Sequence, residues 1–312
     1  MEGRRSARLK STHFDSTDWG LSTLLSLTWG SSFLLIAVAI DHFDPILVPF
    51  GRALIGAIAL AMFPGARVPV DRGDWPRIAL LGLVWMALPF WLFPLAEQTV
   101  ASSVAGMMNG GLPVVMACIT ALWIRRAPSL SRIVAILIGF AGIVIIAVPA
   151  VRADVAGGGS IADPTGITYL CIALLCYAFG ANIARPLQAR YSPARLFVRV
   201  QFAAALWSLP FAISAVGDST FSWPALASTM VLGVFGTGIA FVAFGTLLER
   251  TGLARAMIPT YFTPIVGLFL GAVFRDEHIA PLTVVGMLIV IASAWMMSKP
   301  DARDVTLDDT RR

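Results

Sequence analysis

Long apolar runs alternate with short polar stretches along almost the whole chain. An α-helix needs roughly 20 apolar residues to cross about 30 Å of hydrocarbon. Ten runs approach that length, and we expect each of them to form one membrane-spanning helix. They cover residues 19–40, 46–63, 78–96, 100–124, 132–149, 165–184, 194–216, 224–247, 253–274 and 279–297.

The composition agrees with an all-α polytopic membrane protein. Hydrophobic residues make up 57% of the 312 residues, and charged residues only 13%. Such a chain cannot cover a water-facing surface with polar side chains, which excludes a soluble protein. The three cysteines, Cys118, Cys171 and Cys176, all lie inside apolar runs, so the sequence predicts neither a disulfide framework nor a CxxC site.

The positive charges alternate between successive loops. Of the 23 Lys and Arg residues, only Arg152 and Arg275 fall in one set of loops, while Arg52 and Arg199 fall inside spans; the rest lie in the tails and the other loops. Cytoplasmic loops carry the excess of Lys and Arg. The pattern therefore predicts ten spans with both termini cytoplasmic, in a multi-pass protein of a bacterial-type inner (cell) membrane.

A Gly-rich stretch at 150–164 separates two similar halves of the chain. DPILVPFGR (44–52) resembles SPARLFVR (192–199), and Glu97 and Glu249 are followed by Pro113 and Pro264, 16 and 15 positions later. Since five spans is an odd number, the second copy would enter the membrane from the opposite side. The predicted domains are a cytoplasmic tail (1–18), a first five-helix repeat (19–149), an extracytoplasmic linker (150–164), an inverted second repeat (165–298) and a cytoplasmic tail (299–312).

Ten spans in two inverted repeats resemble the drug/metabolite transporter superfamily, specifically its EamA-type members. The motifs that carry the resemblance are WGSSF (29–33), the weaker copy YAFGAN (177–182), VASSVAGMMNGGLPVVMA (100–117) and LARAMIPTYFTPIVGLFLGAVFRDE (253–277). The resemblance implies a ten-helix carrier of small solutes, often an exporter. It also implies a central cavity lined mainly by the first, third, fourth, sixth, eighth and ninth spans.

Few ionisable residues lie within the predicted spans. The acidic residues lie in tails, loops or helix ends, and His13, His42 and His278 lie in the tail or in loops. This leaves no base beside a nucleophile, no deep pair of carboxylates and no metal-ligand cluster, so we expect neither an enzyme nor a cofactor. Two alternatives stay open for energy coupling: uncoupled facilitation, or coupling through an interfacial carboxylate such as Glu97.

Polar and aromatic residues deep in the spans are the candidate substrate-binding residues. A buried amide or hydroxyl needs a hydrogen-bond partner, so a neighbouring helix could account for each of them equally well. A wall of Trp and Tyr with few charges favours amphipathic or amino-acid-like solutes over highly charged ones. The candidates are Trp29, Ser32, Trp85, Trp91, Asn109, Tyr177, Asn182, Thr237, Thr260 and Tyr261.

Two pairs of residues occupy similar positions in the two halves. Pro113 and Pro264 would each free a backbone carbonyl and kink a helix, either as a gate or as a static kink. Arg52 and Arg199 would either anchor their helices by reaching the headgroups or face an internal aqueous path and attract anionic groups.

Taken together, the sequence predicts a transporter of small metabolites or drugs that works by alternating access, with export as the expected direction. A non-transporting membrane sensor or scaffold is the alternative. The expected partners are a small-molecule solute and the lipid bilayer, and not nucleic acid; a homodimer stays open.

Overall fold

Helices dominate the computed structural model, which describes residues 15–125, 129–155, 163–252, 256–277 and 279–298. Within these ranges, six helical segments are long and apolar enough to cross a membrane, and shorter apolar helices accompany them. The six long segments are Ser16–Ile40, Arg72–Glu97, Ser102–Trp123, Pro164–Gln188, Pro193–Ala215 and Trp223–Thr251. This architecture agrees with the predicted all-helical, polytopic class.

The helices follow one another with short connections. In chain order they are α1 (Ser16–Ile40), α2 (Leu47–Ala61), α3 (Pro64–Arg67), the 3₁₀ turn η1 (Arg72–Asp74), α4 (Trp75–Leu81), the π-helix η2 (Gly82–Ala87), α5 (Leu88–Glu97), α6 (Ser102–Asn109), α7 (Leu112–Trp123), α8 (Leu130–Val155), α9 (Pro164–Gln188), α10 (Pro193–Ala215), α11 (Trp223–Val231), the π-helix η3 (Leu232–Ile239), α12 (Ala240–Thr251), α14 (Pro259–Arg275) and α15 (Pro281–Ser298).

Several predicted spans differ from the structure in detail. The predicted helix at 100–124 breaks at Gly110 and Gly111 into α6 and α7, because consecutive glycines weaken a helix. Helix α1 begins inside the predicted tail, because Asp15 caps it by accepting a hydrogen bond from the Asp18 amide. Helix α8 continues to Val155, inside the predicted linker. The predicted tail residues 1–14 and 299–312 lie outside the described residues.

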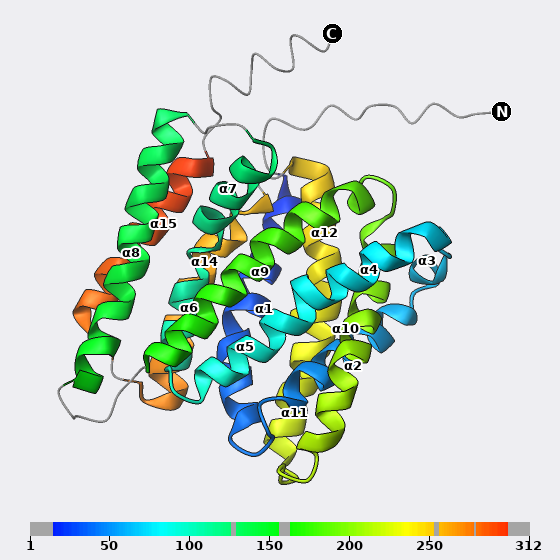
Figure 1. The fold of residues 1–312 in the computed structure, drawn as a ribbon, viewed down its shortest axis with the longest axis horizontal. Coiled ribbons are helices and arrows are strands. Elements are labelled where there is room, and N and C mark those ends of the chain that lie inside the picture. Colours follow the sequence, from blue (N-terminus) through cyan, green and yellow to red (C-terminus); the bar gives the residue numbers. More distant parts are fainter. Residues whose placement is uncertain (1–14, 126–128, 156–162, 253–255, 278, 299–312) are drawn as a thin grey trace.

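The helices form one bundle in which α8 and α15 pack against each other at one side (Figure 1). The other contacts occur in matched pairs. Helix α1 packs on α14 and on the continuous helical segment α11–η3–α12. Helix α9 packs on α7 and on the continuous helical segment η2–α5. Helices α2 and α10 pack on each other, α2 also on η3 and α10 also on η2. Exchanging the two halves of the chain turns each of these contacts into another, or into itself for α2 with α10, as an internal repeat would require.

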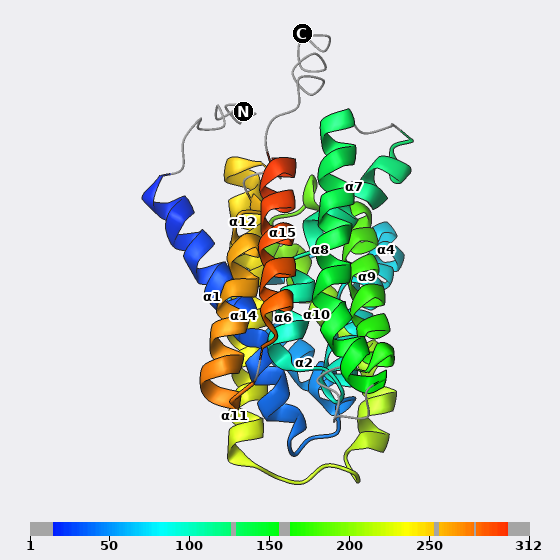
Figure 2. The same cartoon turned by 90° about the vertical axis from the view of Figure 1, so that its left-hand side faces the viewer.

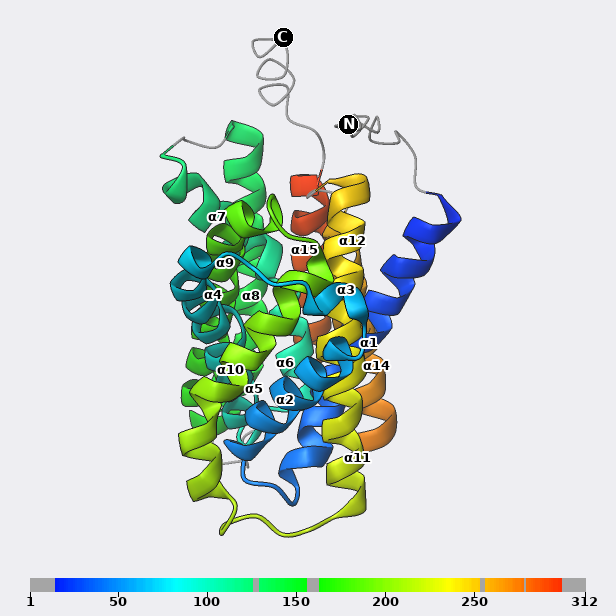
Figure 3. The same ribbon diagram turned by 90° about the vertical axis from the view of Figure 1, so that its right-hand side faces the viewer.

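The described chain begins and ends at the same end of the bundle. Figure 2 shows the start of α1 and the end of α15 at one end, together with the end of α12. Figure 3 shows that the first turns of α1 lean outward there, while its later turns run beside α14. The side of the membrane that this end faces stays a prediction.

Three clusters of buried apolar side chains fill the bundle. One surrounds Phe33 and Phe93, a second surrounds Phe90 and Phe197, and a third surrounds Leu25 and Phe244. Large apolar side chains also cover the outside of the bundle, where the bilayer would solvate them. Examples of these exposed side chains are Leu27, Ile58, Leu122, Val144 and Phe269.

Glycines bring α6 and α14 into close contact. A Cβ atom at Gly106 would lie 3.4 Å from the Cα of Gly267, and one at Gly110 would lie 2.4 Å from the Cγ of Pro264. Small residues at such positions let helix backbones approach each other in a membrane. This contact brings Asn109, the last residue of α6, next to the centre of the bundle.

Candidate solute-binding site

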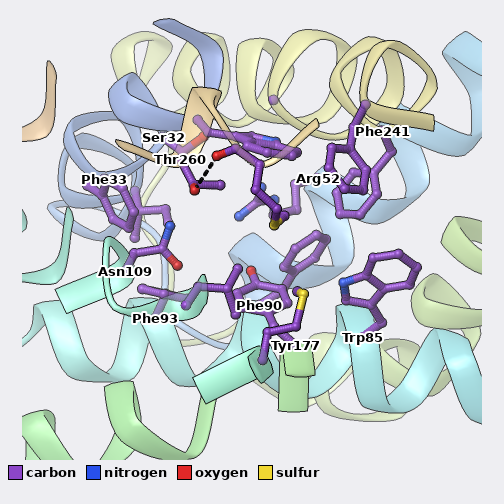
Figure 4. A pocket seen from close by; sticks show the side chains of 17 residues that line it. Ser32, Phe33, Arg52, Trp85, Phe90, Phe93, Asn109, Tyr177, Phe241 and Thr260 are labelled. Carbon is purple, nitrogen blue, oxygen red and sulfur yellow. Dashed lines mark hydrogen bonds between the residues drawn. The ribbon is translucent and has the colours of Figure 1, made fainter. Parts of the chain in front are cut away.

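A cavity lies where the three apolar clusters meet (Figure 4). Each cluster contributes to its wall, with Phe33, Phe90 and Phe244 as examples. The space at this site that no atom fills, including the part open to solvent, is about 730 Å³. The lining residues are Trp29, Ser32, Phe33, Ile36, Arg52, Trp85, Phe90, Phe93, Asn109, Leu112, Met116, Tyr177, Gly236, Phe241, Phe244, Met257 and Thr260.

Both halves of the chain build this cavity. In the first half, the wall residues come from α1, the helical segment η2–α5, α6 and α7, and Arg52 comes from α2. In the second half, the wall residues come from α9, the helical segment η3–α12 and α14, together with Met257 just before α14. A change in the angle between the two halves would therefore change the shape of the cavity.

Six of the predicted substrate-binding residues line the cavity together. Figure 4 shows Ser32 and Thr260 on one side, with Asn109 and Tyr177 on the opposite side. The tryptophans Trp29 and Trp85 complete this set. Residues separated by more than 200 positions in the sequence thus meet at one place.

The remaining predicted residues lie outside the cavity wall. The Tyr261 hydroxyl donates a hydrogen bond to the carbonyl of Ala294 in α15 (2.9 Å). The Asn182 amide donates to the Thr120 hydroxyl (3.1 Å) and so joins α9 to α7. The Trp91 ring packs on Phe211, with ring centroids 5.1 Å apart. These contacts join neighbouring helices, while the Oδ1 of Asn182 and the Nε1 of Trp91 are buried without a hydrogen-bond partner among the described residues.

The two matched prolines occupy different local structures. Pro113 stands in the first turn of α7, directly after the break at Gly110 and Gly111, where a helix tolerates proline well. Pro264 lies inside the continuous helix α14 and packs against Gly110. The contact between Pro264 and Gly110 therefore joins the interior of α14, in the second half, to the break between α6 and α7, in the first half.

Aromatic rings form most of the cavity wall. The Trp29 ring packs on Phe244 with centroids 5.5 Å apart, and the Trp85 ring packs edge to face on Phe241 at 5.7 Å. Phe33 and Phe93 form a further pair at 5.5 Å. Such pairs hold each ring in a defined orientation. The wall therefore presents aromatic faces of defined orientation to the cavity.

Arg52 reaches this aromatic wall from α2, and its side chain is only 5% exposed. Its Nε donates a hydrogen bond to the Thr237 hydroxyl (3.1 Å), and its Cζ lies 3.8 Å from the centroid of the Phe90 ring. Stacking on an aromatic face stabilises a guanidinium. In contrast, Arg199 lies outside the cavity and donates to the backbone carbonyls of Ala66 and Val68.

The π-helix η3 positions the hydroxyl that holds Arg52. The Thr237 hydroxyl donates to the carbonyl of Leu232, five residues earlier, so its lone pairs are left for the arginine. Gly233 lets η3 approach α2, since a Cβ there would lie 3.0 Å from the carbonyl oxygen of Arg52. π-Helical segments often occur at functional sites.

Asn109 presents a polar group that the protein does not satisfy. Its Oδ1 is buried and has no hydrogen-bond partner within the part of the chain that the structure describes. The hydroxyls of Ser32 and Thr260 donate to carbonyls of their own chain segments, Thr28 (2.8 Å) and Met257 (2.6 Å). A solute with a hydrogen-bonding group would find an unsatisfied amide at Asn109.

Ion pairs fasten α1 at both of its ends to helices of the second half. At its start, Asp18 pairs with Arg250 of α12 (2.6 Å); at its end, Asp41 pairs with Arg275 of α14 (2.5 Å). Asp15 also pairs with Arg250. The hydrogen bond from the Asp18 amide, together with the charge of Arg250, lowers the pKa of the Asp15 carboxyl below its usual value.

Two glutamates lie near the end of the bundle where α1 stops. Glu277 accepts hydrogen bonds from the backbone amides of Ser102 and Ser103 at the start of α6. Both carboxylate oxygens of Glu97 are buried, and they have no hydrogen-bond partner among the described residues. Glu97 is the carboxylate that the sequence left open for coupling, and it lies at the end of α5 rather than in the cavity wall.

Sequence reasoning missed the apolar part of the site. Phenylalanine, leucine and methionine residues fill every predicted span, so nothing in their pattern separates the cavity wall from the core or the lipid-facing surface. The aromatic motif WGSSF carried a partial signal, because it placed Trp29, Ser32 and Phe33 close together. The missed residues are Phe33, Ile36, Phe90, Phe93, Leu112, Met116, Gly236, Phe241, Phe244 and Met257.

Three known proteins with similar sequences are named transporters or exporters. The chain is 28% identical to a probable terminal-alkyne amino-acid exporter of Streptantibioticus cattleyicolor, over 90% of this chain and 93% of that protein. It is 24% identical to the uncharacterized inner membrane transporter YedA of Escherichia coli K12, over 90% of each chain. It is 22% identical to an uncharacterized transporter of Archaeoglobus fulgidus, over 89% of this chain and 98% of that one.

A solved crystal structure has the same fold. It matches with a TM-score of 0.62 and 16% identity, over 91% of this chain and 97% of that one. The model of the EamA-like transporter family matches residues 19–148 and 164–299. These matches confirm the resemblance seen in the sequence motifs and the expected multi-pass place in the cell membrane. The chain is a membrane transporter that belongs to the EamA-like transporter family.

Proposed function

We propose that this transporter exports small amphipathic metabolites or drugs, including amino-acid-like solutes, by alternating access around the aromatic cavity. The cavity wall takes side chains from both halves of the chain, and this single observation carries the proposal. A movement of one half against the other would open the cavity first to one side of the membrane and then to the other.

The lining residues support an amphipathic solute. Aromatic rings supply most of the wall, while Asn109, Tyr177 and Arg52 supply polar groups at a few places. Binding sites for small molecules commonly combine an apolar wall with a few polar groups that fix orientation. The name of the relative from Streptantibioticus cattleyicolor supports both export and an amino-acid-like solute.

The ion pairs at the ends of α1 support movement between two states. Asp18–Arg250 and Asp41–Arg275 lie at opposite ends of the same helix, and each joins the first half to the second. The Asp41–Arg275 pair is partly exposed, and a pair of this kind contributes only about 0–1 kcal/mol, so it can break and re-form at low cost. Each pair would close one entrance and release it in turn.

Solute flux through the purified protein tests this proposal. Protein reconstituted in proteoliposomes should release a radiolabelled solute from a panel of amino acids, aromatic acids and hydrophobic drugs faster than empty liposomes. The variants Trp29→Ala and Asn109→Ala should lower that flux, because both side chains line the cavity.

A tryptophan outside the cavity supplies the matched control. Trp123 lies at the end of α7, is half exposed and is absent from the cavity wall. Trp123→Ala should keep the flux of the unmodified protein. No flux for any panel member, or an equal loss in all three variants, would contradict the proposal.

A further inference from the structure

Arg52 is the one charged side chain among the lining residues of the cavity. A cation in the interior of a membrane protein costs several kcal/mol unless a partner compensates it. Such a residue therefore needs an explanation in terms of either a protein partner or a ligand.

The described residues provide no acidic partner in contact with Arg52. The structure gives its guanidinium one hydrogen bond, from Nε to the neutral hydroxyl of Thr237, and no ion pair. Glu97 is the acid whose field reaches Arg52, but neither Glu97 oxygen accepts a hydrogen bond from any described residue. The acids Asp18 and Asp41 pair with other arginines.

The neighbours of Arg52 fix its guanidinium while leaving part of it unused. Phe90 covers one face of the group, and Thr237 takes the Nε hydrogen. The two terminal nitrogens, Nη1 and Nη2, have no hydrogen bond among the described residues. Figure 4 shows Arg52 among the side chains that surround the cavity. A guanidinium whose two terminal nitrogens are free can bind a carboxylate through two parallel hydrogen bonds.

We propose that Arg52 binds the carboxylate of a monoanionic solute whose apolar body lies against the aromatic wall. This inference rests on the proposed function, because it names the class of solute that the same cavity carries. A single cation favours one negative charge, and the surrounding Phe, Trp and Met side chains disfavour a solute with several. The solute carboxylate would thus make the contact with Arg52 that no described carboxylate makes.

Binding of matched acids and amides to the purified protein tests this inference. The probes are 3-phenylpropionate with 3-phenylpropanamide, and octanoate with octanamide; each pair has nearly the same shape and differs by one charge. Affinities are measured by calorimetry in detergent micelles. The unmodified protein should bind each acid more tightly than its amide by about tenfold or more, as expected for hydrogen bonds to a charged group.

Arg52 variants should remove this preference in a graded way. Arg52→Met should bind acid and amide with comparable affinity. Arg52→Lys should keep a reduced preference for the acid, because lysine keeps the charge but lacks the planar guanidinium that donates two parallel hydrogen bonds. Thr237→Val retains the arginine but removes the group that orients it, so it should weaken the preference even where Arg52→Met does not fold. Arg199→Met removes a charge outside the cavity and should leave the preference unchanged.

The outcomes separate this inference from the proposed function. Equal binding of acids and amides by the unmodified protein, no binding of either, or a preference that survives in Arg52→Met would overturn the role of Arg52. Flux of neutral solutes in proteoliposomes could still uphold the transporter proposal in those cases. An acid preference that depends on Arg52 without any solute flux would support the binding site and contradict the proposed transport.

Discussion

The carboxylate of Glu277 accepts hydrogen bonds from the backbone amides of Ser102 and Ser103, each with an oxygen–nitrogen distance of 2.9 Å. It also accepts one from the Ser102 hydroxyl (2.7 Å). The segment after α14 thereby caps the start of α6, where the helix dipole favours a negative charge. A residue of the second half thus holds a helix of the first half beside the cavity.

Loss of this cap should destabilise the protein measurably. Glu277→Gln removes the charge and replaces one of the two accepting oxygens by an NH2 group, which cannot accept a hydrogen bond from the backbone amide that it faces. We expect the free energy of unfolding to fall by about 1.5–3 kcal/mol, the range for hydrogen bonds to a charged group. Thermal unfolding in detergent and faster amide exchange in α6 would report this loss.

Glu249→Gln is the matched control for that change. Glu249 is exposed near the end of α12, and the structure gives its carboxylate no ion pair among the described residues. The control should keep the unfolding temperature of the unmodified protein. If both variants behaved alike, the capping role of Glu277 would be wrong.

The close approach of α6 and α14 predicts a large effect of a single methyl group. Gly110→Ala would place its Cβ 2.4 Å from the Cγ of Pro264, a ring that cannot rotate away. We expect overpacking to cost about 1–3 kcal/mol and to slow any solute flux. Gly20→Ala in α1 should be neutral or stabilising, since no atom lies within 4 Å of the added methyl group. Unfolding temperatures of the two variants provide the comparison.

The contacts of Asn109 and Tyr261 predict opposite effects for two candidate residues. Tyr261→Phe loses the hydrogen bond to the Ala294 carbonyl, so it should cost about 1 kcal/mol of stability and leave solute affinity unchanged. Asn109→Ala removes an unsatisfied amide from the cavity wall, so it should change solute affinity and leave stability nearly unchanged. Thermal unfolding and calorimetric binding on both variants test this contrast. The reverse pattern would contradict the placement of the site.

The ion pairs at the start of α1 should not respond to pH in the neutral range. The pKa of the Asp15 carboxyl lies below its ordinary value of 3.8, because the Asp18 amide and Arg250 favour the charged carboxylate. A lowered pKa adds stability that is present above the unfolded-state pKa and is lost as the pH falls through the folded-state pKa. The difference in unfolding temperature between the unmodified protein and Asp15→Asn should therefore stay constant from about pH 5 to pH 8. A difference that disappears within this range would show that another group controls the contact.

Hydropathy predicted the helical class because bilayer thickness sets the length of apolar runs. It could not predict the π-helices η2 and η3, which depend on packing against α10 and α2. The break at Gly110 and Gly111 was visible as a glycine pair, but its position beside Pro264 depends on a contact between distant helices. Local propensity does not determine such contacts.

The two arginines are a second case in which the local sequence does not determine the contacts of a residue. Arg52 and Arg199 have similar sequence surroundings, and the choice between anchoring and facing an internal path stayed open for both. The structure places Arg52 against Phe90 and Thr237 in the interior, and Arg199 against the backbone carbonyls that follow α2. Arg52 has a partner in the Thr237 hydroxyl of η3, whereas the hydrogen bonds of Arg199 within the described residues go to backbone carbonyls.

Alternating access makes a direct prediction for a single cysteine placed in the cavity wall. Ser32→Cys, in a background where Cys118, Cys171 and Cys176 are replaced by serine, can be probed in sealed vesicles of either orientation with a membrane-impermeant thiol reagent. If access alternates, the cysteine should react from both sides of the membrane, and a bound solute should raise labelling from one side while lowering it from the other. Labelling from one side only, unchanged by any solute, would contradict alternating access.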